Sequence, residues 1–182
     1  MLGLLLMAAG LCRPAFAESE SGSAERLVKA AYLFHFFSLV DWPISSFSSA
    51  AAPLRVGIMA DDALAADMQR LIASRPVSGR PIVVSKIARG ATPPAVHMLF
   101  IGDALRNRLP ELLSPLATDP VLTVTESEHA LAFGSVINFV SVQDTLRFEI
   151  SQDAAARAGL SISSRLLAVS HKFSSVSPKF RQ

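Results

Sequence analysis

Acidic and hydroxyl side chains follow or occupy several apolar segments of this chain, and their placement could support phosphoryl transfer. Asp61 and Asp62 follow the first predicted strand, Asp103 follows the third, and Thr123 and Thr125 lie in the fourth. Carboxylates that meet at one edge of a parallel sheet can bind Mg²⁺, because this ion prefers oxygen ligands. One of the aspartates could then accept a phosphoryl group, so these residues form one candidate chemical site.

This arrangement resembles that of response-regulator receiver domains only in part. That family requires a lysine at the end of its fifth strand, whereas residues 138–143 contain none. An exported protein would also lack an obvious phosphodonor. Asp61 and Asp62 are placed to cap the helix predicted after them, since aspartate is a favoured N-cap residue. We therefore prefer the capping role to the phosphoacceptor.

The remaining polar residues show no catalytic pattern. The chain contains four histidines, which are His35, His97, His129 and His171. Their spacing fits no metal site, and the cluster of Glu126, Glu128 and His129 falls on a predicted exposed turn, so we expect structural roles. The sequence contains neither a Gly-x-Ser-x-Gly elbow nor a phosphate-binding glycine loop. We predict no catalytic residues, no metal and no cofactor.

The elements that must position these residues follow an α/β pattern. Segments typical of strands lie at 54–59, 82–87, 96–101, 120–125, 136–140 and 146–150. Helical spacing occurs at 63–72, 104–113, 127–133, 154–159 and 162–169. This alternation predicts a mostly parallel central sheet flanked by helices. The last two strands, joined by a polar turn at 141–145, form a C-terminal antiparallel hairpin. We predict a single α/β domain over 24–170 and a flexible tail over 171–182.

The longest apolar segment after the N-terminal region is predicted to be a central helix. Residues 27–40 have apolar positions three and four apart, and the helix ends before Pro43. Its uncharged run is shorter than the roughly 20 residues that span a bilayer. We predict that this helix packs in the core, with contact to a partner chain as the alternative.

The N-terminal residues are typical of an export signal. An apolar run at 2–11 and the small residues Ala15 and Ala17 predict a signal peptide over 1–17, cleaved after Ala17. Residues 18–23 then read as a loose polar linker, with Ser23 capping the central helix. Loss of Arg13 reduces the formal charge from +2 to +1, which argues against nucleic acid as a partner. Cys12 is the only cysteine, so the mature chain would contain no disulfide. Its lipidation is disfavoured, because a lipoprotein leader needs a small residue where Leu11 stands.

Six motifs occur in order along most of the mature chain. They are KAAYL (29–33) with VDWP (40–43), VSGRPI (77–82), HMLFI (97–101), PVLTV (120–124) with VINFV (136–140), RFEI (147–150), and AGL (158–160) with ISSRLL (162–167). In their sequence and order they resemble the YfiR-like family.

The resemblance implies a periplasmic regulatory protein rather than an enzyme. Such a protein binds and restrains the periplasmic sensor region of an inner-membrane diguanylate cyclase, which lowers cyclic-di-GMP signalling. The resemblance also implies a homodimer and an outer-membrane lipoprotein that draws the regulator away. Family members often carry a cysteine where Val96 stands here, so redox control through a disulfide is not expected, and apolar packing around Val96 should replace the stabilisation.

The C-terminal segment is the predicted partner surface. Ile162, Leu166 and Val169 share one face of the predicted helix 162–169, and Leu160 and Leu167 add apolar surface beside it. An exposed apolar patch of this kind marks an interaction site. The alternative, in which these residues pack inward on their own sheet, stays open. A second hypothesis for function is a periplasmic sensor whose partner affinity changes when a small molecule binds.

Overall fold

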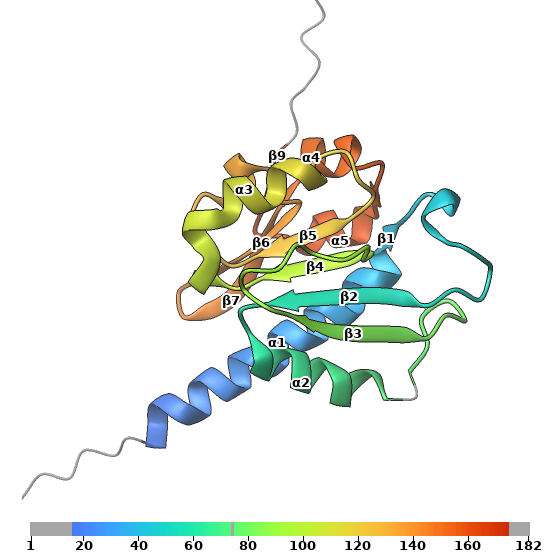
Figure 1. Cartoon of the computed structure of the whole chain (residues 1–182). Helices are drawn as coiled ribbons and strands as arrows, with labels where there is room; N and C mark the ends of the chain where they lie inside the picture. The colour runs from blue at the N-terminus through green and yellow to red at the C-terminus, as the bar shows by residue number, and fades with distance from the viewer. Residues whose placement is uncertain (1–15, 74, 175–182) are drawn as a thin grey trace, which may run out of the picture.

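The computed structural model describes residues 16–73 and 75–174 of the 182-residue chain, with side chains described for 21–73 and 75–172. A seven-stranded sheet forms its centre (Figure 1), in the order β3-β2-β4-β5-β6-β7-β9. The strands are β2 (Leu54–Met59), β3 (Ile82–Ile87), β4 (Met98–Ile101), β5 (Leu122–Thr125), β6 (Ile137–Val142), β7 (Thr145–Ser151) and β9 (Lys172–Ser174). Neighbouring strands from β3 to β6 are parallel, and β7 runs antiparallel to β6. The predicted α/β class with its C-terminal hairpin is therefore confirmed.

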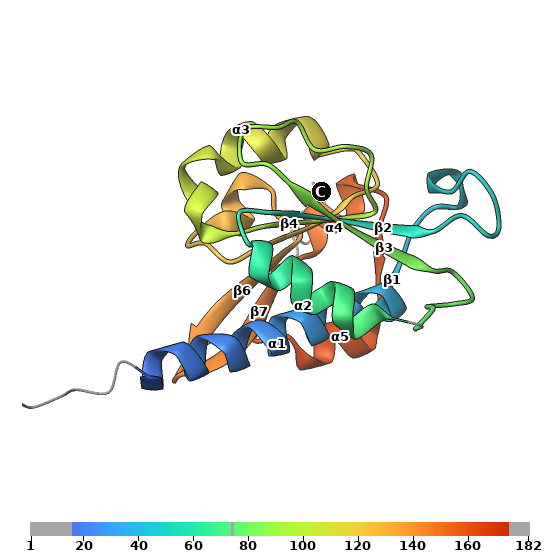
Figure 2. The same ribbon diagram turned by 60° about the horizontal axis from the view of Figure 1, so that its bottom comes forward.

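Helices cover both faces of the sheet. On one face lie α1 (Phe16–Leu39), α2 (Asp62–Ile72) and α5 (Ser164–Val169), and Figure 2 shows α1 running between the other two. On the other face lies α3 (Leu109–Leu113), preceded by the 3₁₀ helix Asp103–Arg108 and followed by another at Ser114–Leu116. Two apolar clusters fill the layers, because parallel strands are buried on both faces.

The central helix packs in the core, as predicted. Leu33 and Phe36 are fully buried, and Phe36 lies among the aromatic rings of Tyr32, Phe139 and Phe148. The Tyr32 ring lies 5.3 Å from that of Phe148, edge to face, and the Phe36 ring lies 6.1 Å from that of Phe139. Aromatic pairs prefer such tilted or offset arrangements. In the described part of the chain, no helix combines the length and hydropathy needed to cross a membrane.

Four local predictions are wrong, and the first concerns the start of α1. Residues 18–23 are helical and not a linker, and Ser23 is not an N-cap, because the helix already begins at Phe16. No proline interrupts this stretch, so the helix anchored by the core can extend outward through it. Most of the predicted signal peptide, residues 1–15, lies outside the described residues, so cleavage after Ala17 stays a prediction.

The second correction concerns the predicted helix 104–113, which is broken in two. Residues Asp103–Arg108 form a 3₁₀ helix and α3 follows with Pro110 in its first turn. Proline has no amide hydrogen and clashes with the preceding turn, so it is accepted at a helix start but not in a helix interior. Pro110 was the signal for this break.

The third and fourth corrections concern the C-terminus, where short strands replace the first residues of the predicted helix 162–169 and of the predicted tail 171–182. Ile162 lies in β8 (Ser161–Ile162), which pairs antiparallel with β1 (Val40–Asp41), and α5 begins only at Ser164. The predicted tail also begins in the fold, because β9 pairs in parallel with β7. Residues 175–182 lie outside the described part of the chain.

Two turns and one helix cap complete the fold. The 3₁₀ helix Ala130–Phe133 ends at Gly134, which has a φ of 103°. The hairpin closes with only two residues, Gln143 and Asp144, at φ angles of 50° and 56°. Positive φ angles at both central residues are typical of the type I′ turn, whose twist matches that of the two strands it joins. α4 (Gln152–Arg157) is capped by the Ser151 hydroxyl, which accepts from the Ala154 amide.

Candidate functional site

The carboxyl edge of the parallel sheet, where ligands usually bind in such folds, is occupied by salt bridges. Glu126 follows β5 and accepts hydrogen bonds from Lys29 Nζ at 2.7 Å and from the Asp103 amide at 3.1 Å. Lys29 also pairs with Glu25 at 2.7 Å. Burial alone would lower the pKa of Lys29, but hydrogen bonds to Glu126 and Glu25 outweigh it and raise the pKa. Lys29 therefore fixes α1 against this edge as a permanent cation.

The three aspartates proposed for phosphoryl transfer do not come together. Asp61 Oδ1 accepts from the Leu64 amide at 2.8 Å and caps α2, while Asp103 pairs with Arg106 at 2.8 Å. Asp62 lies 4.0 Å from Lys86 on the protein surface. Among residues 16–73 and 75–174, no three His, Cys, Asp or Glu side chains are grouped to hold a metal ion. The preferred capping role is confirmed for Asp61.

The two threonines of β5 take part in a buried hydroxyl network. Thr125 Oγ1 lies 2.9 Å from Ser135 Oγ and 2.8 Å from Asn138 Oδ1. Thr123 Oγ1 accepts from the Val136 amide at 3.0 Å. These bonds join β5 to the start of β6 and satisfy polar groups in the core. Thr123 and Thr125 thus position the strands, and they have no access to a substrate.

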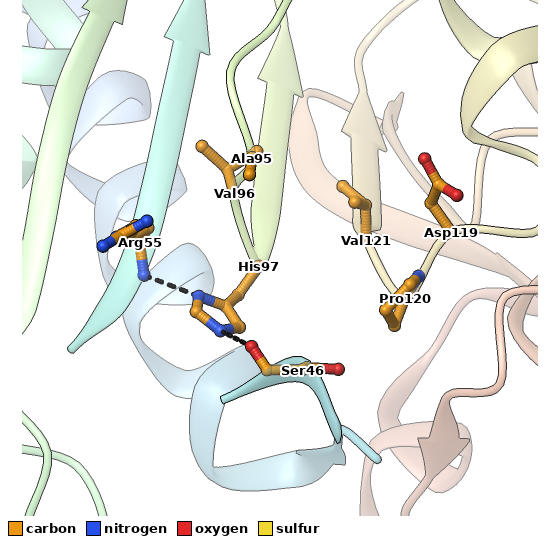
Figure 3. Close-up of a pocket in the computed structure, with 8 residues that line it drawn as sticks. All are labelled: Ser46, Arg55, Ala95, Val96, His97, Asp119, Pro120 and Val121. Carbon is orange, nitrogen blue, oxygen red and sulfur yellow. Dashed lines mark hydrogen bonds between the residues drawn. The ribbon is translucent and has the colours of Figure 1, made fainter. Parts of the chain in front are cut away.

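The amino edge of the sheet contains His97, a buried polar residue directly before β4. Its ring makes two hydrogen bonds (Figure 3): Nδ1 accepts from the Arg55 amide at 3.0 Å, and Nε2 lies 3.2 Å from the Ser46 carbonyl. An amide nitrogen can only donate, so Nδ1 must be unprotonated and Nε2 must carry the proton. His97 is therefore held as the neutral Nε2–H tautomer.

The surroundings of His97 add further contacts to the same group. The Phe47 ring stacks on the imidazole with centroids 4.7 Å apart, and the Arg80 guanidinium covers the other side of Phe47 at 4.0 Å. Trp42 Nε1 donates to the His97 carbonyl at 3.0 Å. Burial lowers the pKa of His97, and the nearby charges of Arg55 and Arg80 lower it further, against an opposing effect of the Ser46 hydrogen bond.

A small pocket lies beside His97, with a volume of about 210 Å³. Figure 3 shows the side chains around it, which come from the ends of neighbouring segments and include Arg55, Val96, Asp119 and Val121. Ser46 Oγ is buried and has no hydrogen-bond partner. Val96 contacts the second apolar cluster, in agreement with apolar packing at this position.

The predicted partner residues divide into two groups. Leu160 and Leu166 are buried in the main core cluster, with Leu166 only 1% exposed. Ile162 and Leu167 are partly buried against the same cluster, whereas Val169 is 60% exposed. Ile162, Leu166 and Val169 do not share a helical face, because Ile162 lies in β8. Leu160 and Leu166 thus pack inward, and a partner could reach only the other three.

The other three histidines are exposed, and the sequence predicts exposure only for the turn that contains His129. His35 contacts Phe34 edge to face, His129 precedes the 3₁₀ helix 130–133 with a φ of 60°, and His171 precedes β9. Sequence reasoning missed how far His97 differs from them. Its position directly before an apolar strand was the available signal, because a polar residue there must find partners at the sheet edge.

A family model matches most of the chain. The model described as YfiR/HmsC-like matches residues 26–171, which is most of the chain and includes every strand of the sheet except β9. No curated protein matches the chain.

Proposed function

The chain belongs to the YfiR/HmsC-like family, and we propose that it binds and restrains the periplasmic sensor region of an inner-membrane diguanylate cyclase. Members of this family are periplasmic regulators of diguanylate cyclase signalling rather than enzymes. The restraint would hold cyclic-di-GMP output low until the regulator is released. The family match over residues 26–171 is the observation that carries this proposal.

Deletion of the protein, with cellular cyclic-di-GMP measured, tests this role. The nucleotide concentration should rise in the deletion strain and return when the full chain is supplied again. The same chain without residues 1–17 should not restore it, because it would not be exported. An unchanged cyclic-di-GMP concentration in the deletion strain would contradict the restraint model.

We propose that the cyclase contacts the surface formed by Ile162, Leu167 and Val169, with Leu160 and Leu166 supporting it from beneath. Val169 leaves apolar area in water at the end of α5. A specific complex needs roughly 800 Å² on each partner. The contact must therefore extend past these three side chains to the neighbouring parts of α5 and α4.

The substitution Val169→Asp tests this surface. It should weaken binding of the purified periplasmic region of the cyclase at least tenfold in calorimetry, with an unchanged circular-dichroism melt, because Val169 has little packing to lose. Ile44→Asp is the matched control, since Ile44 is 91% exposed and lies before β2, at the amino edge of the sheet. Equal binding by all three proteins would remove the C-terminal surface from the proposal.

Three further parts of the proposal come from the family. We propose export with cleavage after Ala17, assembly as a homodimer, and release of the cyclase when an outer-membrane lipoprotein binds the regulator. The mass of the periplasmic protein tests the cleavage site, and light scattering of the purified protein tests the dimer. A mass that includes residues 1–17 would contradict the first, and a monomer at micromolar concentration would contradict the second.

The second candidate is a sensor domain that binds a small molecule and acts on another signalling protein. The unpartnered Ser46 Oγ beside the pocket at His97 favours it, because a ligand could supply the missing hydrogen bond. The pocket volume of about 210 Å³ is, however, below the roughly 300–1,000 Å³ of ordinary ligand sites. Calorimetry against periplasmic metabolites tests this candidate. Binding abolished by Ser46→Ala would support it, and no heat with any of them would exclude it.

A further inference from the structure

His97 connects three segments that are distant in sequence. Its ring bonds to β2 through the Arg55 amide and to the 43–53 loop, defined as the residues between Trp42 and β2, through the Ser46 carbonyl. Its carbonyl accepts from Trp42, where α1 and β1 end. Arg80 also holds this loop, because its Nη1 donates to the carbonyls of Ser49 and Ala52 and its guanidinium stacks on Phe47. His97 adds a hydrogen bond that joins Ser46 of the loop to the same ring that binds β2.

We propose that His97 is an acid-sensitive latch, and that protonation of its ring releases the 43–53 loop from the amino edge of the sheet. The Arg55 N–H points at Nδ1. A proton on Nδ1 would place two donors against each other, so the hydrogen bond to Arg55 would be lost. An orphaned amide and a new cation at a partly buried position are both unfavourable. Release of the loop lets water reach both groups.

The charges that face His97 favour release at acid pH. Arg55 of β2 and Arg80 of the 77–80 turn are both cations, and both repel an imidazolium. Asp119, before β5, is the acidic residue among those that line the same pocket. The 43–53 loop itself contains no ionisable side chain. The positive charges of Arg55 and Arg80 agree with the lowered pKa of His97.

The direction of the pH dependence follows from this lowered pKa. The latched state holds His97 neutral, whereas a released His97 regains an ordinary pKa near 6.5. The released state therefore binds more protons, and the latch is complete at pH values above about 6.5. Its stability falls as the pH drops from about 6.5 towards the pKa of the latched state. The periplasm follows the pH of the surroundings, so this range is one that an exported protein meets.

Amide hydrogen exchange by ¹⁵N NMR at pH 7.5 and pH 5, corrected for the intrinsic rates, tests the latch. The Arg55 amide should exchange at least tenfold faster at pH 5, because its acceptor is the His97 ring. The amides of Phe47 and Ala52 bond to carbonyls within the loop, and they should also exchange faster because release frees the loop from the sheet. The Phe100 amide in β4 should keep its protection, which separates local release from global unfolding. The midpoint of the change in the Arg55 signal should coincide with the titration of the His97 ring.

The variant His97→Asn is the matched test, because its side-chain oxygen can accept from Arg55 but cannot be protonated. The acid-dependent exchange should disappear in this variant and persist in His171→Gln, which removes an exposed histidine. Protection that is retained while His97 titrates in the wild-type protein would overturn the proposal, even if the Asn variant does not fold. The same acid dependence in a folded His97→Asn variant would also overturn it.

Discussion

The substitution Asp67→Asn removes the charge that joins α1 to α2. The Asp67 carboxylate is 2% exposed and accepts from Arg26 Nε of α1 at 2.6 Å. Arg70, one turn further along α2, bonds to its other oxygen. An asparagine has nearly the same shape but leaves Arg26 without an anionic partner. We expect a loss of stability with no change in the arrangement of the elements.

The size of the loss follows from the exposure of the two arginines. Removing one partner of a fully buried ion pair costs about 3–5 kcal/mol. Arg26 is 32% exposed, so water compensates part of its charge, and a charge-assisted hydrogen bond of about 1.5–3 kcal/mol is the better measure. Arg70 is 75% exposed and adds at most about 1 kcal/mol. We therefore expect a loss of about 2–3 kcal/mol, or roughly 5–10 °C in the melting temperature.

The stability lost in Asp67→Asn should depend on pH, and the direction follows from the pKa of Asp67. Burial alone would raise the pKa of Asp67, but the hydrogen bonds and charges of Arg26 and Arg70 outweigh it and lower the pKa. A group whose pKa is lower in the folded state stabilises the fold above its unfolded pKa of about 3.9. This stabilisation is lost as the pH falls from that value through the folded pKa. The difference between wild type and Asp67→Asn should therefore shrink at acid pH.

Urea unfolding followed by circular dichroism at pH 7 and pH 3 measures the loss of stability and its dependence on pH. Asp62→Asn is the control for the same chemical change, because Asp62 is 82% exposed and its pair with Lys86 is weak; about 0.5 kcal/mol is expected there. If Asp67→Asn lost no more than this control at pH 7, the salt bridge would not be holding α1 to α2. A loss of equal size at pH 3 would show that packing, not charge, is responsible.

Three further predictions concern stability. Leu166→Ala should cost about 2–5 kcal/mol in urea unfolding, since Leu166 is buried, whereas Val169→Ala should stay within about 0.5 kcal/mol; equal costs would contradict the burial of α5. Replacing Gln143 and Asp144 by Asn-Gly should raise the free energy of unfolding by about 1 kcal/mol, because both positions have positive φ angles. A lower stability would show that these side chains make contacts worth more than the strain. A reductant should leave the melting temperature unchanged, because Cys12 is the only cysteine and a single cysteine cannot form a disulfide within the chain. A change in the melting temperature would show that Cys12 joins two chains through a disulfide.

The sheet could be predicted from the sequence because its strands are short segments rich in apolar residues. The run at 98–101, in which every side chain is buried, is typical of a strand covered on both faces, and the alternation with helices implies parallel pairing. The short pairing of β1 with β8 had no comparable signal. Strands of two residues have no period, and their pairing depends on contacts between the two ends of the chain.

The polar sites were harder to predict, since their partners are distant in sequence. Asp67 sits in an ordinary amphipathic helix, and nothing near it identifies Arg26, which lies 41 residues earlier, as its partner. His97 likewise bonds to a carbonyl 51 residues away. The role of the C-terminal segment could not be decided from the sequence for a related reason, because helical spacing identifies an apolar face without saying whether that face meets the core or a partner.

The two ends of the domain are coupled where the proposed partner surface lies. Val40 pairs with Ile162, and the Ser163 amide donates to the Leu39 carbonyl, so the end of α1 fixes the start of α5. Two residues further along the chain, the Trp42 side chain bonds to the carbonyl of His97. A change at the His97 latch therefore has a short covalent and hydrogen-bonded route to Ile162. If both proposals hold, acid pH should weaken binding of the cyclase region to the wild-type protein more than to His97→Asn. Equal weakening of both would show that the latch and the partner surface act independently.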